Sequence, residues 1–453
     1  MSTRPMNNIH GPHVLLVNPW IHDFAAYDFW AKPLGLLTLG GILRAHGARV
    51  SYVDCLDRFH PRSVARPSPP ARGGRGPYLK TVIPKPPGLS DIPRNYCRYG
   101  IPPEWLRDDL TALDPPDLVL VTSLMTYWYP GVRETIAAVK SVFPGAPVIL
   151  GGIYATLWPD HARRVCGADQ VVTGPGEAAL IQLAAQYTGW SPAPAFDPTD
   201  LDSQPWPALD LEHHLAHAPV MASRGCPFKC AYCASHRLQP RMRHRSPASV
   251  VAEIGHWHCE HGVDDFAFYD DALLVDAERS IIPLLEGVID AGLNLRFHTP
   301  NALHLRELTP SLARLMLRAG FHTIRLGLET TNFDRRQAMD SKVTEADFLR
   351  AVDALKRAGF RPEQVGAYLL AGLPGQDITA LERSIAVVKQ AGVTPVIAHY
   401  TPIPHTPMWA AAVAASRYDL AADPIYTNNA IFPCQSEAFS WDVLTRLKDL
   451  TRR

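Results

Sequence analysis

Short apolar runs alternate with stretches of helical periodicity along most of the chain, a pattern typical of parallel sheets covered by helices. Within the first 190 residues, five runs predict buried strands: 13–20 (HVLLVNPW), 48–54 (ARVSYVD), 117–124 (DLVLVTSL), 146–152 (APVILGG) and 168–174 (ADQVVTG). Helical segments separate several of them, for example LGLLTLGGILRAHG at 34–47. We therefore predict a Rossmann-like parallel sheet over residues 10–190.

A second series of strands and helices follows a Pro- and Asp-rich linker at residues 191–215. Its six strand candidates are PVMASRG, DFAFYDD, LRFHTPNA, TIRLGLET, VGAYLLAGLPG and PVIAHYTPIP. Ser246 and Thr344 stand where two of the intervening helices need N-caps. The whole chain is thus predicted to be α/β, with a partial (β/α)6 TIM-type barrel at 216–410 and a short C-terminal extension at 411–453. In such barrels the chemistry lies at the carboxyl ends of the strands.

Residues 60–105 interrupt the first series with a segment rich in Pro, Gly and basic residues. Loops of this length are uncommon inside compact domains. The aromatic and apolar residues of 78–101 favour an ordered lid over a flexible linker.

The composition excludes several classes of protein. Lys+Arg and Asp+Glu both count 44 in 453 residues, so no bulk positive charge recruits nucleic acid. No run approaches the roughly 18 apolar residues that span a bilayer, and the N-terminus lacks a signal-peptide pattern. We expect a cytoplasmic protein with neither a membrane nor a nucleic-acid partner. In a reducing compartment, clustered cysteines are more typical of metal binding or catalysis than of disulfides.

Three cysteines lie within eight positions of ASRGCPFKCAYCAS (222–235), with the spacing Cys226-x3-Cys230-x2-Cys233. Four thiolates would complete a structural zinc site or an iron–sulfur cube, whereas three leave one iron of a cube open. A zinc site with a more distant fourth ligand is the alternative, and His236 is a nearby candidate.

The spacing, with Tyr232 just before the third cysteine, resembles the radical S-adenosylmethionine (SAM) superfamily, and the resemblance extends over residues 220–405. It implies a 4Fe-4S cluster held by the three cysteines, with SAM chelating the open iron and yielding a 5′-deoxyadenosyl radical. It also implies a set of cofactor-binding residues beside the cluster, all but the first at barrel strand ends: Tyr232, Asp270 or Asp271, Asn301, Glu329, Gly372 and Gly375.

Each of these strand-end residues also has a purely structural interpretation. Asp270 and Asp271 depart from the family's Gly-Gly-Glu motif, and either could cap the following helix. Glu329 could form an ion pair with Arg325 or Arg296. The two glycines, Gly372 and Gly375, could simply make a turn.

A Rossmann-like domain ahead of such a barrel resembles the cobalamin (B12)-binding module of B12-dependent radical SAM enzymes. That resemblance implies that Ser123 and Gly151-Gly152 lie beside the nucleotide tail of the corrinoid, although Gly-Gly also makes a plain strand-to-helix turn. The Asp-x-His-x-x-Gly motif is missing, since His22 has no Asp at the required spacing. The cobalt is therefore expected to receive no histidine from the protein.

Together these resemblances imply methylation of an unactivated carbon in a small-molecule substrate. Cobalamin would deliver the methyl group, a second SAM would renew it, and a donor such as flavodoxin or ferredoxin would reduce the cluster. One alternative is radical cyclisation or rearrangement without methyl transfer. Another is methylthiotransferase-like chemistry with a second cluster on Cys55, Cys97 and Cys166. A hypothesis from a different class is a non-catalytic iron–sulfur electron carrier or sensor.

Overall fold

The computed structural model describes residues 11–63, 73–333, 339–340, 343–434 and 440–452. The chain forms two compact units. The first unit comprises residues 1–27, 31–66 and 77–214, and the second comprises Asp28–Trp30, Pro67–Gly76 and Leu215–Arg453. No hydrophobic pattern indicated that two short described pieces of the N-terminal region, residues 28–30 and 73–76, belong to the unit of the barrel. One cause is Trp30, whose ring stacks on His298 with 4.4 Å between centroids.

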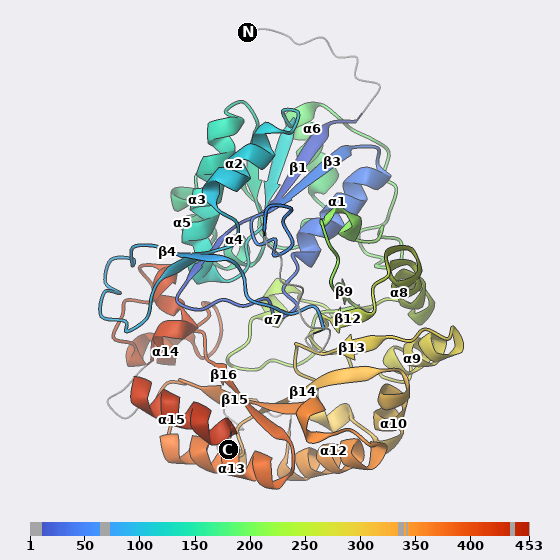
Figure 1. Cartoon of the computed structure of the whole chain (residues 1–453), viewed down its shortest axis with the longest axis vertical. Helices are drawn as coiled ribbons and strands as arrows, with labels where there is room; N and C mark the ends of the chain where they lie inside the picture. The colour runs from blue at the N-terminus through green and yellow to red at the C-terminus, as the bar shows by residue number, and fades with distance from the viewer. Residues whose placement is uncertain (1–10, 64–72, 334–338, 341–342, 435–439, 453) are drawn as a thin grey trace. The chain divides into compact units, whose positions relative to one another are not determined.

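The first unit is built on a five-stranded parallel sheet in the order β3-β1-β6-β7-β8. Strands β1 and β3 of this sheet are labelled in Figure 1. Its strands are His13–Asn18 (β1), Arg49–Asp54 (β3), Leu118–Val121 (β6), Val148–Leu150 (β7) and Gln170–Val171 (β8). In order of appearance, the strands of this sheet run 2-1-3-4-5, so the winding reverses between β1 and β6. Sheets of this kind bind ligands beyond the carboxyl ends of their strands, at the reversal.

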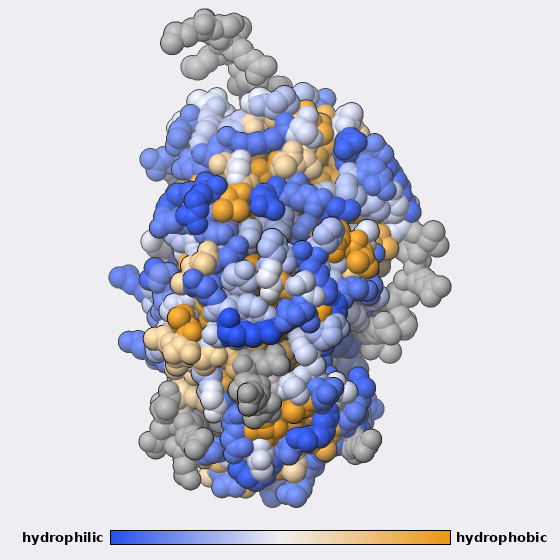
Figure 2. Space-filling view, turned by 90° about the vertical axis from the view of Figure 1, so that its left-hand side faces the viewer, coloured by the Kyte–Doolittle hydropathy of each residue, from blue (hydrophilic) through white to orange (hydrophobic). Residues whose placement is uncertain are grey.

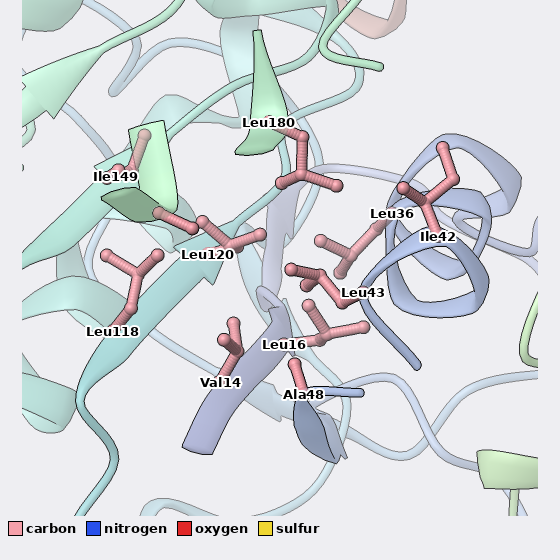
Figure 3. Close-up of a cluster of buried hydrophobic side chains, with 11 residues drawn as sticks. Val14, Leu16, Leu36, Ile42, Leu43, Ala48, Leu118, Leu120, Ile149 and Leu180 are labelled. Carbon is pink, nitrogen blue, oxygen red and sulfur yellow. The ribbon is translucent and has the colours of Figure 1, made fainter. Parts of the chain in front are cut away.

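Helices cover both faces of this sheet, which is why its strands read as continuous apolar runs. They are Leu34–Ala45 (α1), Tyr129–Val142 (α3), Ile153–Leu157 (α4), Pro159–Val165 (α5) and Leu180–Thr188 (α6). Side chains of α1 and α6 meet the strands in one buried cluster that includes Leu16, Leu43 and Leu120 (Figure 3). Leu15 and Val119, which alternate with these positions along the strands, are fully buried as well. Residues 191–214, predicted as a linker, belong to this unit, where the Ala208 N–H bonds the Leu37 carbonyl at 2.9 Å.

The described part of the insertion at 60–105 is ordered. Lys80–Val82 (β4) and Cys97–Tyr99 (β5) join Ile21–Asp23 (β2) in an antiparallel sheet of order β2-β5-β4, followed by the helix Pro103–Thr111 (α2). Tyr78, Cys97 and Tyr99 pack there against Ile21 and Leu56. Residues 64–72 of the insertion lie outside the described residues.

The second unit is a partial barrel of six parallel strands, which confirms the predicted fold class. Its strands are Ala218–Val220 (β9), Asp265–Phe268 (β12), Arg296–His298 (β13), Phe321–Glu329 (β14), Val365–Ala371 (β15) and Thr394–His399 (β16). Each strand pairs in parallel with the next one along the chain. β9 and β16 form the two edges of the sheet, so the barrel is open on one side.

Among the described residues, the longer helices between these strands are Pro247–His261 (α8), Ile281–Asp290 (α9), Pro310–Arg318 (α10), Glu345–Ala358 (α12) and Ile378–Gln390 (α13). Both predicted N-caps are confirmed, since Ser246 accepts from the Ser249 N–H and Thr344 forms a capping box with Asp347. Trp409–Ala415 (α14) and Trp441–Arg452 (α15) complete the chain.

The polarity of the surface and the lengths of the helices agree with the balanced, moderately polar composition. The face in Figure 2 carries mainly hydrophilic residues with scattered hydrophobic ones, as expected for 44 basic and 44 acidic side chains. None of the helices in the described ranges is both long enough and apolar enough to cross a membrane.

Candidate active site

The cysteine loop begins at the carboxyl end of the first barrel strand. Its base is closed by an antiparallel pair, Ser223–Arg224 (β10) with Arg243–His244 (β11). Gly225 precedes the first cysteine with a φ of +88°, and a Cβ there would lie 2.7 Å from the Arg241 carbonyl oxygen. Only glycine combines that conformation with so close an approach. The backbone at the entry into the cysteine loop therefore requires glycine at position 225.

The far side of the cysteine loop is anchored to segments that follow β14 and β16. The Ala231 N–H donates to the Met339 carbonyl at 2.8 Å, and the Met408 N–H donates to the Ala231 carbonyl at 3.0 Å. The helix Ser235–Leu238 (α7) follows the third cysteine. Three strands of the barrel thus contribute to the position of one short loop.

The three thiols suit an iron–sulfur cluster. Cys230 is buried, while Cys226 and Cys233 are partly exposed. His304 Nε2 lies 3.7 Å from the sulfur of Cys226, and the Ser235 N–H donates to the sulfur of Cys233 at 3.4 Å. A hydrogen bond donated to a cysteine sulfur, as by the Ser235 N–H, would stabilise the negative charge of a ligating thiolate.

A mononuclear metal site gains no support from the residues that the structure describes. Among them, no three His, Cys, Asp or Glu side chains are grouped as one metal ion would require, so the zinc alternative with His236 stays without evidence. The cysteines of a cube each bind a different iron and need not converge on one point.

The carboxylate of Asp270 is hydrogen-bonded within the protein. Its carboxylate accepts hydrogen bonds from the Ala222 N–H at 3.1 Å, the Ser223 N–H at 2.5 Å and the Ser223 hydroxyl at 2.7 Å. Burial raises the pKa of Asp270 to about 6, although these donors act in the opposite direction. Asp270 therefore positions the entry of the cysteine loop, and its carboxylate does not cap the following helix.

Asp271 lies at the other end of the cysteine loop. Its side chain hydrogen-bonds Ser235, and burial raises its pKa. The Ser235 hydroxyl oxygen in turn lies 3.2 Å from the sulfur of Cys233. Of the two adjacent carboxylates, Asp271 is thus the one close to a cysteine of the motif, and the better candidate for the SAM amino group. Sequence reasoning missed Ser235, which no motif singles out.

Asn301 connects two strand ends. Its Nδ2 donates to the carbonyl oxygens of Tyr269 at 2.8 Å and Asp270 at 3.3 Å. The side-chain amide therefore holds the segment after β13 against the segment after β12. Contact between Asn301 and SAM stays a prediction.

Glu329 ends β14 in a left-handed conformation, with a φ of +61°, and is buried. Such a conformation is unfavourable for a residue other than glycine and is often found at functional sites. Arg296 pairs with Asp265 at 2.7 Å, and Arg325 donates to the Ile324 carbonyl at 2.9 Å; neither of these contacts involves Glu329.

Tyr232 lies near Glu329 and Asp340. Its hydroxyl donates to Asp340 Oδ2 at 3.1 Å. Burial, together with the charges of Glu329 and Asp340, raises the pKa of Tyr232 well above its usual value. The tyrosine of the cysteine motif is therefore a neutral donor that connects the loop to the segment after β14.

Gly372 and Gly375 form a turn at the carboxyl end of β15, with φ values of +89° and +61°. Gln376 closes the turn, since its Oε1 accepts from the Gly372 N–H and its Nε2 donates to the Leu370 carbonyl, both at 2.7 Å. The turn alone accounts for both glycines, and close approach of adenine to them stays a prediction.

In the first unit, Ser123 and the two glycines meet at the carboxyl ends of β6 and β7. Ser123 Oγ donates to the Gly151 carbonyl at 2.6 Å. Gly152 has a φ of +98°, and a Cβ there would lie 2.3 Å from the Ser123 carbonyl oxygen, whereas a Cβ on Gly151 would meet no atom within 4 Å. Gly152 is thus required by backbone packing, whereas Gly151 borders open space, and contact of either residue with a corrinoid stays a prediction.

The other candidate residues of this unit are buried and make contacts within it. His22 is buried, with its Nε2 2.9 Å from Glu134. Cys55, Cys97 and Cys166 are also buried, and burial raises the pKa of the Cys55 and Cys166 thiols. Cys97 packs in the cluster of the small antiparallel sheet, while the Cys166 thiol bonds the Tyr154 hydroxyl. These contacts give no support to a second cluster.

The chain matches two protein families. Residues 220–388 match the radical SAM superfamily, and residues 99–184 match the B12 binding domain. An uncharacterized methyltransferase of Pyrococcus horikoshii is 25% identical over 350 residues, which cover 68% of this chain and 74% of that protein. The anaerobic magnesium-protoporphyrin IX monomethyl ester cyclase of Cereibacter sphaeroides is 25% identical over 342 residues. That match covers 68% of this chain but only 54% of the cyclase.

Solved structures show the same fold. The radical SAM methyltransferase TsrM of Kitasatospora setae, solved with cobalamin and a 4Fe-4S cluster bound, superposes with a TM-score of 0.65 at 17% identity, covering 90% of this chain and 76% of TsrM. The cobalamin-dependent enzyme OxsB, with aqua-cobalamin bound, gives a TM-score of 0.59 at 14% identity, covering 92% of this chain and 58% of OxsB. The chain therefore carries a radical SAM domain, matched at residues 220–388, and ahead of it a B12-binding domain, matched at residues 99–184.

Proposed function

We propose that this protein methylates an unactivated carbon of a small-molecule substrate, using SAM, a 4Fe-4S cluster and cobalamin. The observation that carries the proposal is that one chain holds both a radical SAM domain and a B12-binding domain. Similarity to the Pyrococcus horikoshii methyltransferase and to the fold of TsrM supports it. When bound, the cluster supplies the electron that cleaves SAM, and cobalamin supplies the methyl group.

The residues of the chain divide this work. Cys226, Cys230 and Cys233 hold the cluster, and Asp271 binds the SAM amino group beside it. Asp270 and Asn301 position the strand ends around the loop. In the first unit, the open space at Gly151 admits the nucleotide tail of the corrinoid. An external donor such as flavodoxin or ferredoxin reduces the cluster before each cleavage of SAM.

Product analysis tests the proposal. Protein reconstituted anaerobically with iron, sulfide and hydroxocobalamin is reduced and given SAM. Methyl transfer predicts S-adenosylhomocysteine, about one per bound corrinoid in a single turnover, beside 5′-deoxyadenosine. The same protein without corrinoid should release 5′-deoxyadenosine but no S-adenosylhomocysteine. If corrinoid-loaded protein forms no S-adenosylhomocysteine, methylation is the wrong reaction.

A second candidate is radical cyclisation or rearrangement without methyl transfer. Similarity to the anaerobic magnesium-protoporphyrin IX monomethyl ester cyclase over 68% of this chain favours it. In that case the loaded protein forms 5′-deoxyadenosine alone. A non-catalytic electron carrier would form neither product, so the same experiment separates all three functions.

A further inference from the structure

We propose that His304 donates a hydrogen bond from Nε2 to the thiolate of Cys226 and thereby raises the reduction potential of the cluster. The inference rests on the proposed function only in that Cys226 is a cluster ligand. It identifies a positioning residue that acts on the iron through a sulfur atom and does not itself bind iron or SAM.

The geometry places the imidazole directly beside the ligand. His304 Nε2 lies 3.7 Å from Cys226 Sγ, a hydrogen-bonding distance for the large sulfur atom. Only 7% of His304 is exposed, so water competes little for the ring nitrogen. The residue lies at the carboxyl end of β13, in the same loop as Asn301.

The chemistry of the ligand decides the direction of the hydrogen bond. A cysteine bound to iron is a thiolate and has no proton to give. Its sulfur can only accept, so the contact requires the hydrogen of the imidazole on Nε2. That requirement holds for the neutral Nε2–H tautomer and for the imidazolium alike.

One contact orients the ring of His304, and another fixes the backbone just before it. Phe228, two residues after Cys226, packs edge-on against the His304 ring with 4.5 Å between centroids. The preceding residue, Leu303, is fixed because its N–H donates to the Arg325 carbonyl at 2.8 Å. The imidazole is therefore oriented before a cluster is bound.

The bond from His304 differs in kind from the one that Cys233 receives. The Ser235 backbone N–H serves Cys233, and almost any residue type would supply it. The donor to Cys226 is one particular side chain. Hydrogen bonds to cluster sulfurs stabilise the more negative, reduced state and so raise the potential, and a buried bond does so more strongly.

The test is a redox titration of the reconstituted cluster, followed by electron paramagnetic resonance in the absence of SAM, corrinoid and substrate. His304→Phe and His304→Leu remove the donor and should shift the midpoint potential to a more negative value at unchanged iron and sulfide content. His304→Gln keeps an N–H donor and should restore part of the shift. His258→Phe is the matched control, because His258 bonds the Val263 carbonyl at the end of α8, and its potential should equal that of wild type.

Each outcome decides the matter. Unchanged potentials in loaded His304→Phe or His304→Leu protein overturn the proposal. If both donor-free variants fail to load while His304→Gln loads, the N–H donor is needed at the sulfur, and the potential of His304→Gln decides: a value below that of wild type supports the proposal and an equal value overturns it. If His304→Gln fails as well, His304 has a structural role and the proposal is overturned. Failure of methyl transfer leaves this result untouched, whereas wild-type protein without iron would refute the cluster itself.

Discussion

The carboxylate of Asp270 accepts the backbone N–H of Ser223 at 2.5 Å and so ties the end of β12 to the strand that enters the cysteine loop. The next residue, Asp271, hydrogen-bonds Ser235 just beyond the third cysteine. Two adjacent carboxylates therefore brace opposite ends of one loop. They differ in their capacity to accept a hydrogen bond from a ligand, because Asp270 already accepts three from the protein.

The three cysteines should be needed for cluster assembly. Cys226→Ala, Cys230→Ala or Cys233→Ala should abolish both the binding of about four iron and four sulfide per chain and the release of 5′-deoxyadenosine. Iron and sulfide analysis measures the first effect and chromatography the second. Cys259→Ala is the control, since Cys259 is exposed on α8. Full cluster content in any of the three motif variants would refute the ligand assignment.

Asp271→Asn should weaken SAM binding while the cluster stays loaded. One lost charge-assisted hydrogen bond is worth roughly 1.5–3 kcal/mol, so affinity should fall about tenfold or more. Equilibrium binding of SAM to reconstituted protein measures the change. Asp290→Asn, on the exposed end of α9, should bind SAM like wild type. Normal affinity in Asp271→Asn would show that this carboxylate only braces Ser235.

Asp270→Asn should affect stability more than SAM affinity. An amide offers one acceptor oxygen where the carboxylate offers two, so a donor of Ala222 or Ser223 loses its buried partner. That loss costs about 1–3 kcal/mol. We expect a lower thermal midpoint and a reduced iron content, measured by calorimetry and iron analysis. A stable, fully loaded variant with selectively weak SAM binding would instead place Asp270 against the ligand.

Gly151→Leu should block retention of the corrinoid without unfolding the first unit. A Cβ at Gly151 would meet no protein atom within 4 Å, and a leucine side chain extending from it would occupy the space left for the nucleotide tail. Protein incubated with hydroxocobalamin and passed through gel filtration should lose the corrinoid absorbance, while 5′-deoxyadenosine formation persists. Gly151→Ala, with only a methyl group, is the graded control. Gly152 is unsuitable for this test, because any side chain there collides with the Ser123 backbone. Full retention of the corrinoid by Gly151→Leu would show that the corrinoid does not bind beside Gly151.

Asp265 should contribute to stability in a pH-dependent way. Burial acts to raise its pKa, but hydrogen bonds from His298 and Arg296 prevail and lower it to about 2, from 3.8. Lowering the pKa of this carboxyl from 3.8 to about 2 corresponds to about 2 kcal/mol of stability for the ionised form. This contribution is complete above about pH 4 and is lost as the pH falls through about 2.

Asp265→Asn should therefore lower the unfolding free energy of the apo-protein by about 2 kcal/mol at pH 7. The difference from wild type should narrow between pH 4 and pH 2, measured by denaturant titration at each pH. Asp290→Asn again serves as the control. A difference that stays constant over this range would show that the carboxylate charge is not the source of the effect.

Local patterns in the sequence determined most of the architecture. The runs that became β1 and β6 are apolar throughout because helices bury both faces of their parallel sheet, so their identity is visible without knowledge of their neighbours. Ser246 and Thr344 cap helices through contacts only three residues long. The spacing of Cys226, Cys230 and Cys233 is likewise local, since one loop carries all three ligands.

Tertiary structure alone decided which residues around these motifs do what. Asp270 and Asp271 are indistinguishable in sequence, yet one bonds Ser223, 47 positions away, and the other bonds Ser235. Gly151 and Gly152 differ only because the Ser123 backbone lies against one of them. His304 reaches Cys226 across 78 positions. Contacts between strand ends depend on how the whole barrel brings distant segments together, and no periodicity or spacing along the chain records them.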